Sequence, residues 1–402
     1  MLAVVAPGQG AQVPGFLVPW LEDPAFADRL GWLSAVADVD LAHFGTAADA
    51  ETIRDTAIAQ PLLVGTALVA ALQLFPHPTE AFRAIGVAAG HSVGEIAAAA
   101  GVGVLSAEQA MVFVRERGKA MAAAAATTRT GMTAVVGGDP DEVLAVIERH
   151  GLTPANHNGP GQVVAGGTAD QLAAFTADAP IRARLVPLRV AGAFHTVHMA
   201  RAAKTLGGYA RAISTHDPRT RLLSNADGQV VHDGRTVLER LVRQVSTPVR
   251  WDLCLQTMAD LGVSGLLEMP PAGTLVGIAK RALPGVATFA LKTPDQLDDA
   301  RAFVAAHASA SPLEGNPTWR LLVAPSKGTF LRDHELADST TGVRLAPGTP
   351  IGVVRSLRDT TPVATAHGGV LVEWLVEEGD PVSPGQPLLR VHPDPSDPAL
   401  AE

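Results

Sequence analysis

The chain has 402 residues, of which 47% are hydrophobic, 18% charged and 4% aromatic, and 31 basic against 40 acidic residues give a net charge of −9. A length near 400 predicts two or three domains, and the apolar content excludes a chain that is disordered throughout. The acidic balance, without any lysine- or arginine-rich block, argues against a nucleic-acid-binding surface.

The N-terminal ten residues and the single cysteine bear on the compartment in which the protein works. The segment MLAVVAPGQG is apolar, but the first basic residue is Arg29, so the charged region that opens a signal peptide is missing. No apolar run approaches the roughly 20 residues that cross a bilayer. Cys254 alone can form neither an intrachain disulfide nor a cysteine-based metal cage. We therefore expect a soluble, cytoplasmic protein.

Two short apolar runs near the N-terminus are typical of buried parallel strands. Residues 2–6 end at Pro7 and the loop GQGAQ, and residues 84–89 lead directly into GHSVGE and the helix-like segment IAAAAGVGVL. A strand, a sharp turn and then a helix is the pattern of layered α/β proteins. We therefore predict an α/β body that begins at the N-terminus.

The pattern changes over residues 129–191, where strands and helices are predicted in the order β-α-β-β-α-β. This order is that of a ferredoxin-like unit, which we expect to be inserted into the α/β body. The body then resumes with a helix near 197–213, a strand over 221–225 and a strand–loop–helix over 266–281. The predicted core domain thus comprises residues 1–128 and 192–307.

The last 95 residues differ in amino-acid composition from the rest of the chain. Residues 308–318 are rich in Pro, Gly, Ser and Asn and predict a linker. Residues 319–392 are rich in Val, Gly and Pro without a plausible long helix, which predicts a small all-β domain. Residues 393–402 are acidic and proline-punctuated, and we expect them to be disordered.

The segment GHSVG at 90–94 matches G-x-S-x-G, the nucleophile elbow. A serine on a tight strand-to-helix turn needs small neighbours, which Gly90 and Gly94 provide. The helix that follows directs its free N–H groups at the reacting oxygen. With 39 glycines in the chain a chance match is possible, but the strand before and helix after the motif favour Ser92 as a nucleophile.

A serine nucleophile needs a base, and the segment GAFHTVHM offers His195 and His198. Two alternatives are ordinary surface histidines and a metal-binding pair, although no carboxylate lies nearby in the sequence. His195 follows an apolar segment at the junction between the insert and the body, where clefts form. We favour His195 as the base and expect no metal.

Several further motifs occur in the order found in one family. They are QPLL at 60–63, VRERGKAM at 114–121, NHNGPGQVVAGG at 156–167 and PPAGTLVGIAKR at 270–281, besides GQGAQ, GHSVGE and GAFH. Over residues 1 to about 300 the chain resembles the malonyl-CoA:acyl-carrier-protein transacylases, and VAGAFHT and PVRWDLC resemble actinobacterial members of fatty-acid synthesis. The resemblance implies an α/β-hydrolase-like acyltransferase core with the ferredoxin-like insert.

The resemblance also implies roles for individual residues. Ser92 would carry the malonyl group and His195 would act as general base and acid, oriented by the backbone carbonyl of Gln244. The backbone amides of Gln9 and Val93 would form the oxyanion hole. Arg117 would bind the malonyl carboxylate, and Phe194, which packing alone could also explain, would line the malonyl pocket. Malonyl-CoA is then the substrate, an acyl carrier protein the acceptor, and no cofactor is bound.

The C-terminal segment has a resemblance of its own, which is strong over residues 369–391 and weak before them. PSKGTF, GTPIGVVRSLRDT and GGVLVEWLVEEGDPVSPGQPLLRV are similar to biotinyl/lipoyl carrier domains, which implies a flattened β-barrel. The family's acceptor lysine falls on Arg358, and the only lysine after residue 312 is Lys327, away from the hairpin tip. A guanidinium stays protonated and cannot be acylated. We therefore expect neither biotin nor lipoate.

The function of such an unmodified domain has two explanations. It could dock to an acyl-CoA carboxylase and place the transacylase where malonyl-CoA is made, or it could be a fusion remnant. For the whole chain the alternatives are an acyltransferase of a polyketide pathway, a scaffold protein acting through the carrier-like domain, and a serine esterase. The motifs around Ser92, His195 and Arg117 favour an active transacylase.

Overall fold

The structure is a computed structural model that describes residues 1–308, 320–334, 336, 343–357, 359–366 and 368–393. It divides into two compact units, residues 1–310 and 311–402, so the boundary lies close to the predicted end of the core domain at 307. Parts of the predicted linker at 308–318 and of the tail at 393–402 lie outside the described residues, as does Arg358.

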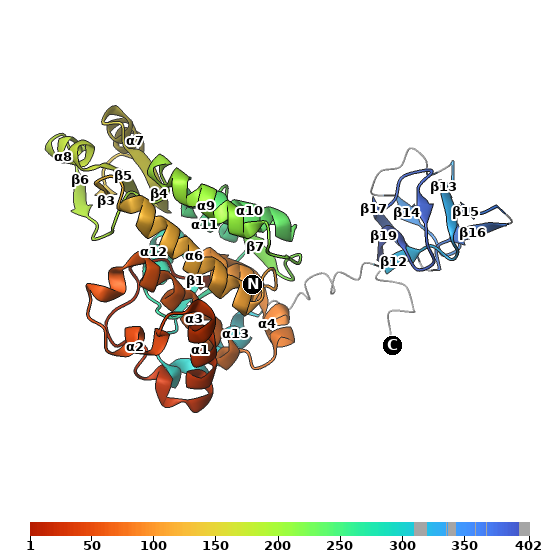
Figure 1. The fold of residues 1–402 in the computed structure, drawn as a ribbon, viewed down its shortest axis with the longest axis horizontal. Coiled ribbons are helices and arrows are strands. Elements are labelled where there is room, and N and C mark those ends of the chain that lie inside the picture. Colours follow the sequence, from red (N-terminus) through yellow and green to blue (C-terminus); the bar gives the residue numbers. More distant parts are fainter. Residues whose placement is uncertain (309–319, 335, 337–342, 358, 367, 394–402) are drawn as a thin grey trace. The chain divides into compact units, whose positions relative to one another are not determined.

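A six-stranded sheet forms the centre of the first unit, in the order β11-β10-β1-β2-β7-β8. Figure 1 labels β1 and β7 of this sheet among the helices of the unit. Adjacent strands of this sheet run parallel to each other, except that β7 and β8 pair antiparallel. The strands are β1 (Leu2–Ala6), β2 (Ile85–Gly90), β7 (Arg221–Leu223), β8 (Val230–Val231), β10 (Gly265–Glu268) and β11 (Ala287–Ala290). The prediction of an α/β body is confirmed.

Strand β1 shows why the sheet is covered on both faces. Leu2 and Ala6 belong to the larger hydrophobic core, whereas Ala3 and Val5 belong to the core on the opposite face. Both sets are buried because successive side chains of a strand point to opposite faces. The continuous apolar run of the sequence is therefore that of a central parallel strand.

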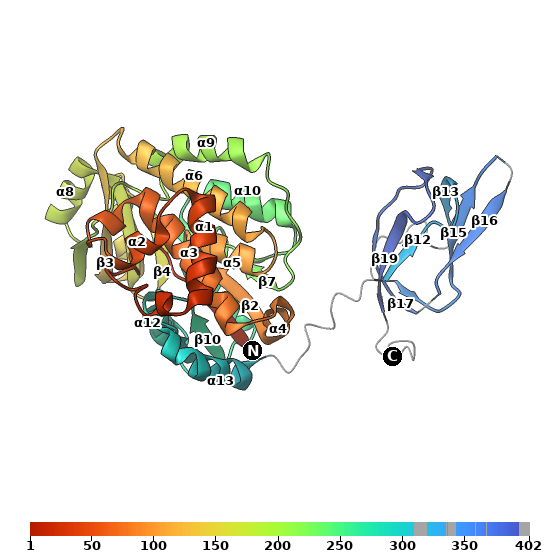
Figure 2. The same cartoon turned by 60° about the horizontal axis from the view of Figure 1, so that its bottom comes forward.

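Helices cover both faces of this sheet (Figure 2). The larger core receives side chains from helices that include α3, α5 and α6, and the smaller core from α11 and α12. The helices of the body are α1 (Pro24–Ala37), α2 (Leu41–Thr46), α3 (Thr56–Leu74), α4 (Pro78–Ala84), α5 (Gly94–Gly101), α6 (Ala107–Ala125), α9 (Ala200–Ala210), α10 (Gly234–Gln244), α11 (Trp251–Asp260), α12 (Thr274–Ala282) and α13 (Leu297–His307).

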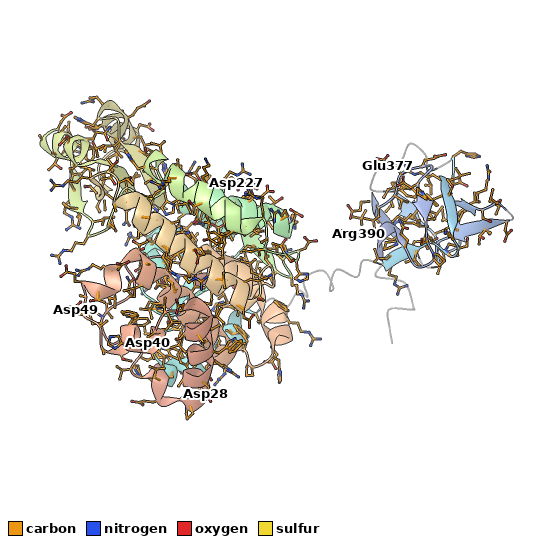
Figure 3. The ribbon with its side chains drawn as sticks, viewed as in Figure 1. Asp28, Asp40, Asp49, Asp227, Glu377 and Arg390 are labelled. Carbon is orange, nitrogen blue, oxygen red and sulfur yellow. The ribbon has the colours of Figure 1, made fainter. Side chains whose placement is uncertain are left out.

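Aspartates begin many of these helices, which accounts for part of the acidic balance. Asp40 accepts a hydrogen bond from the His43 amide at the start of α2, and Asp49 accepts from the amides of Glu51 and Thr52 at the start of the short 3-10 helix Thr52–Arg54 (Figure 3). A carboxylate at these positions satisfies amides that have no partner within the helix and complements the helix dipole. These hydrogen bonds lower the pKa of Asp49.

Helix α3 corrects one prediction from the sequence. We expected no apolar segment near the length of a membrane span, but Thr56–Leu74 has 19 residues and a mean hydropathy of 1.7, so by length and composition it could cross a membrane. Gln60 and Pro61 are the two residues that interrupt its apolar character near the N-terminus, and both are buried in the helix. Two thirds of the helix (67%) is buried in the protein, as in a core helix, so this is weak evidence for a membrane span.

A separate five-stranded sheet follows α6, in the order β6-β3-β5-β4-β9. Its elements are β3 (Thr130–Gly137), α7 (Pro140–Arg149), β4 (Thr153–Gly159), β5 (Gln162–Thr168), α8 (Ala169–Ala177) and β6 (Ala183–Pro187), joined by the short β9 (Val249–Arg250). Strands β3, β4, β5 and β6 pair antiparallel, whereas β9, which directly precedes α11, pairs parallel with β4.

The second unit consists of two four-stranded sheets, β12-β19-β17-β14 and β16-β15-β13-β18, around their own hydrophobic core. The strands are β12 (Arg320–Val323), β13 (Gly328–Arg332), β14 (Arg344–Leu345), β15 (Pro350–Arg355), β16 (Thr360–Ala364), β17 (Gly369–Trp374), β18 (Pro381–Val382) and β19 (Pro387–Pro393). Arg390, labelled in Figure 3, forms an ion pair with Glu373 across β17 and β19.

Candidate active site

Ser92 lies at the carboxyl edge of the central sheet, on the turn between β2 and α5. Its φ angle is +53°, a value that a residue with a side chain rarely adopts. A Cβ atom on Gly90 would lie 2.0 Å from the carbonyl carbon of Gly94, and one on Gly94 would lie 2.2 Å from the Ala6 oxygen. The two glycines of the motif are therefore required by close backbone contacts, and the strained turn presents the Ser92 hydroxyl.

Ser92, His195 and the Gln244 backbone form a hydrogen-bonded chain. Ser92 Oγ lies 2.7 Å from His195 Nε2, and His195 Nδ1 lies 2.7 Å from the Gln244 carbonyl oxygen. Because a carbonyl can only accept, Nδ1 carries the proton, and Nε2 is left free to accept the proton of the serine hydroxyl. The arrangement gives a nucleophile, a base and an orienting acceptor without a carboxylate on the histidine.

His195 is buried, with 3% of its surface exposed. Burial, followed by the positive charge of Arg117, lowers the pKa of His195 to about 3. The imidazole is therefore neutral at physiological pH and ready to accept a proton from Ser92. Sequence reasoning could not anticipate this shift, because Arg117 is 78 positions away in the chain.

Arg117 extends from α6 to the nucleophile and is 1% exposed. Its Nη1 donates to Gln60 Oε1 at 2.7 Å, and its Nη2 donates to Gln244 Oε1 at 2.9 Å and to Ser92 Oγ at 3.3 Å. Burial lowers its pKa to about 10, so the guanidinium stays charged at neutral pH. Within the described residues its Nε has no acceptor and only one of its two Nη1 hydrogens has one, which leaves two N–H donors for an anionic group.

The side chain of Gln244 connects Arg117 to a second buried charge. Gln244 Nε2 donates to Glu95 Oε2 and to the backbone oxygen of Ser92, while its Oε1 accepts from Arg117. Burial raises the pKa of Glu95 to about 7, partly offset by hydrogen bonds from Asn225 and Gln244. The Glu95 carboxyl group thus orients the Gln244 side-chain amide so that its Oε1 faces Arg117 and accepts a hydrogen bond from it.

Asn225 supports the elbow from β7. Its side-chain Oδ1 accepts a hydrogen bond from the Ser92 backbone amide at 2.8 Å, and its Nδ2 donates to the Gly90 carbonyl oxygen at 2.8 Å. The backbone amide of Asn225 donates to Glu95 Oε1 at 3.2 Å. Sequence reasoning selected neither Asn225 nor Glu95. Glu95 directly follows the elbow motif and Asn225 follows a strand in an α/β fold, and these positions are the only signals that could have identified them.

The predicted oxyanion-hole amides lie on the two loops that meet at this edge of the sheet. Val93 is the N-cap of α5, and Gln9 follows β1, which is the neighbour of β2 in the sheet. Among the described residues neither amide has a hydrogen-bond acceptor, so both are free to bind an oxyanion. Their role stays a prediction that this placement permits.

Phe194 and His198 flank the base. Phe194 is 6% exposed and packs in the larger hydrophobic core, so its place in an acyl pocket stays a prediction. His198 is partly exposed, and its amide donates to Thr196 Oγ1. In the part of the chain that the structure describes, no group of three His, Cys, Asp or Glu side chains is placed to hold a metal ion.

The raised pKa of Glu95 predicts how the activity of this site depends on pH. Below pH 7 the carboxyl is protonated, and above pH 7 it is ionised and accepts fully from Gln244 and Asn225. We expect kcat/KM to rise with pH through about 7 and this rise to disappear in Glu95→Gln. The pH profiles of the two proteins test this, with Glu239→Gln on the exposed face of α10 as control. A rise that persists in Glu95→Gln would show that another group titrates.

Comparisons with known proteins place this geometry in context. Residues 4–307 match the family model described as acyl transferase domain. The malonyl CoA-acyl carrier protein transacylase of Mycobacterium tuberculosis H37Rv is 48% identical over 299 residues, covering 74% of this chain and 99% of that protein. The crystal structure of MCAT from M. tuberculosis has 47% identity and a TM-score of 0.72, covering 75% of this chain and 99% of that one.

A further solved structure shows a type II polyketide synthase acyl carrier protein in complex with its malonyl transacylase. That chain has 28% identity and a TM-score of 0.69, and the match covers 75% of this chain and 99% of that one.

Proposed function

This chain belongs to the acyl transferase domain family, and from this premise we propose that it moves malonyl from malonyl-CoA to the phosphopantetheine thiol of an acyl carrier protein. The observation that carries the proposal is the buried Arg117, whose Nη2 lies 3.3 Å from the Ser92 hydroxyl. A guanidinium so close to the nucleophile favours an acyl group that ends in a carboxylate, as malonyl does. The M. tuberculosis relative and the solved complex with a carrier protein support this donor and this acceptor.

In the first half-reaction His195 Nε2 accepts the proton of Ser92 as Oγ attacks the thioester carbonyl of malonyl-CoA. The tetrahedral oxyanion is stabilised by the amides of Gln9 and Val93, each of which contributes about 10²–10³ in rate. The carbon–sulfur bond then breaks, and the CoA thiolate takes the proton from His195. Malonyl remains as an ester on Ser92, with its carboxylate on Arg117.

In the second half-reaction the carrier's phosphopantetheine thiol gives its proton to His195 and attacks the ester. The bond to Ser92 Oγ breaks, and the serine recovers its proton from His195. The same base thus serves both steps, as microscopic reversibility requires. The Gln244 carbonyl keeps His195 in the same tautomer throughout, because the proton on His195 Nδ1 stays hydrogen-bonded to that carbonyl in both steps.

The test is a two-acceptor assay with purified protein and malonyl-CoA. We expect the carrier protein to gain one malonyl group by mass spectrometry, much faster than malonyl-CoA is hydrolysed in its absence. Acetyl-CoA in parallel measures the preference for a charged acyl group. Equal rates of transfer and hydrolysis would indicate an esterase instead.

The pathway, the compartment and the finer architecture are part of the same proposal. We place the enzyme in fatty-acid synthesis in the cytoplasm, with the polyketide pathway as the alternative that carriers from each pathway would distinguish. We interpret residues 129–191 as a ferredoxin-like insert; the strand order β6-β3-β5-β4 supports this. We interpret residues 319–392 as a biotinyl/lipoyl-like barrel, which the two four-stranded sheets support.

We propose that the second unit is unmodified and docks to an acyl-CoA carboxylase. Lys327 is exposed but precedes β13 and lies outside the hairpin of β15 and β16. We expect no streptavidin signal and no biotinyl or lipoyl mass, and co-purification of a carboxylase that is lost when residues 311–402 are deleted. A mass increase equal to a biotinyl group would contradict the proposal that the second unit is unmodified. If the full chain and the chain without residues 311–402 purify with the same partners, the docking proposal is wrong and the second unit is a fusion remnant.

A further inference from the structure

Arg117 contacts the nucleophile directly, in addition to the residues that hold the guanidinium in place. Its Nη1 donates to Gln60 Oε1 at 2.7 Å, and its Nη2 donates to Gln244 Oε1 at 2.9 Å. The same Nη2 donates to Ser92 Oγ at 3.3 Å, the longest of the three hydrogen bonds. Nη2 carries two hydrogens and already has two acceptors, so it has no N–H left for a further group.

A carboxylate that binds Arg117 through two parallel hydrogen bonds must take one of these Nη2 hydrogens. A guanidinium has two edges that hold a carboxylate in this way, Nε–H with Nη2–H and Nη1–H with Nη2–H. Both edges include Nη2, because Nε–H and Nη1 lie on opposite sides of the group. The bond to Ser92 is the longer of the two on Nη2, at 3.3 Å against 2.9 Å for Gln244, so Ser92 Oγ is the acceptor that a carboxylate would replace.

The contact with Arg117 restrains the Ser92–His195 pair. Ser92 Oγ attacks with a lone pair, and an N–H of a cation directed at this oxygen withdraws electron density from it. The same cation weakens the base, because after burial the charge of Arg117 is the next largest cause that lowers the pKa of His195 to about 3. A carboxylate paired with the guanidinium would offset that charge and let the pKa of His195 rise.

We propose that the carboxylate of the acyl group activates the nucleophile, because by pairing with Arg117 it releases the Ser92 hydroxyl for attack. This step rests on the malonyl transfer proposed above and specifies how the same site selects its acyl group. Acetyl has no carboxylate, so Arg117 stays on Ser92 when acetyl-CoA reacts. Discrimination between the two acyl groups then lies in the rate of acylation, because the difference arises in the reacting groups after the thioester has bound.

Acetylation in the presence of formate tests the proposal. Formate is the smallest carboxylate and can pair with Arg117 beside the acetyl group without being consumed. At constant ionic strength we expect saturating formate to raise the single-turnover rate of Ser92 acetylation by acetyl-CoA about two- to tenfold, the effect of one hydrogen bond. Formamide has the same shape without the charge and should leave the rate unchanged. A rate that formate does not raise, or that formamide raises equally, overturns the proposal.

The malonyl reaction should respond to the same anion with the opposite sign. Malonyl brings its own carboxylate to Arg117, so formate competes with malonyl-CoA for the guanidinium. We expect formate to raise KM for malonyl-CoA and to leave the single-turnover rate of malonylation at saturating malonyl-CoA unchanged. A malonylation rate that rises with formate would show that the anion acts elsewhere, and it would contradict the release of Ser92.

Arg117→Ala shows whether the guanidinium is the group on which formate acts. Acetylation of this variant should not respond to formate, whereas Arg115→Ala, on the same helix but paired with Glu116, should be activated like the wild type. Equal activation in Arg117→Ala overturns the proposal.

Two features keep the test decisive. The formamide and malonyl measurements use the wild type alone, so they hold even where Arg117→Ala does not fold. Malonyl transfer by the wild type is a separate readout of the proposed function. Its absence contradicts that function, whereas intact malonyl transfer without formate activation contradicts only the release of Ser92.

Discussion

Ser92→Ala is expected to reduce malonyl transfer by at least about 10⁴-fold, because it removes the hydroxyl that lies 2.7 Å from the base His195. The measurement is a single-turnover assay in which radiolabelled malonyl-CoA is followed onto the protein. Wild type should become labelled in the absence of carrier protein, and Ser92→Ala should not. Labelled Ser92→Ala protein would mean that another residue is the nucleophile.

The histidine pair gives this prediction a matched control. His195→Ala removes the base that lies 2.7 Å from Ser92 Oγ and should cost about 10²–10⁴-fold. His198→Ala, three residues later and partly exposed, should stay within about twofold of the wild type. The double variant Ser92→Ala/His195→Ala should be no slower than Ser92→Ala alone, since the two groups act as one unit. Multiplied losses would show that they act separately.

Arg117→Ala is expected to lower kcat/KM for malonyl-CoA by about 10²-fold while acetyl transfer is partly retained. The guanidinium can donate two parallel hydrogen bonds to the malonyl carboxylate, and acetyl offers no such group. Arg117→Lys should recover only part of the loss, because an ammonium cannot form the planar fork. The ratio of malonyl to acetyl kcat/KM is the measurement that isolates this effect.

Two features of the site define the controls for Arg117. The guanidinium also donates to Gln60 and Gln244, so its removal leaves buried acceptors unpaired and should lower stability as well. Retained acetyl transfer separates this loss from a loss of fold. Arg115→Ala, on the same helix but paired with Glu116 near the surface, should leave the malonyl preference unchanged. Full malonyl selectivity in Arg117→Ala would mean that the assignment is wrong.

The features that depend on local pattern could be predicted from the order of the residues. The apolar runs predicted the α/β body, and the glycines of GHSVG predicted a tight turn at the serine, because both depend on residues that are adjacent in the chain. The ordered motifs predicted the family over residues 1 to about 300, in agreement with the match to residues 4–307. Arg117 came only from that resemblance, since a single arginine on a helix carries no signal of its own.

The balance of charges at the site depends on contacts between distant parts of the chain, so the folded arrangement was needed to see it. Glu95, Gln244 and Arg117 are separated by up to 149 positions in the chain, yet they form one buried hydrogen-bonded network beside Ser92. Their pKa shifts arise from burial and from these neighbours, and neither is encoded in local spacing.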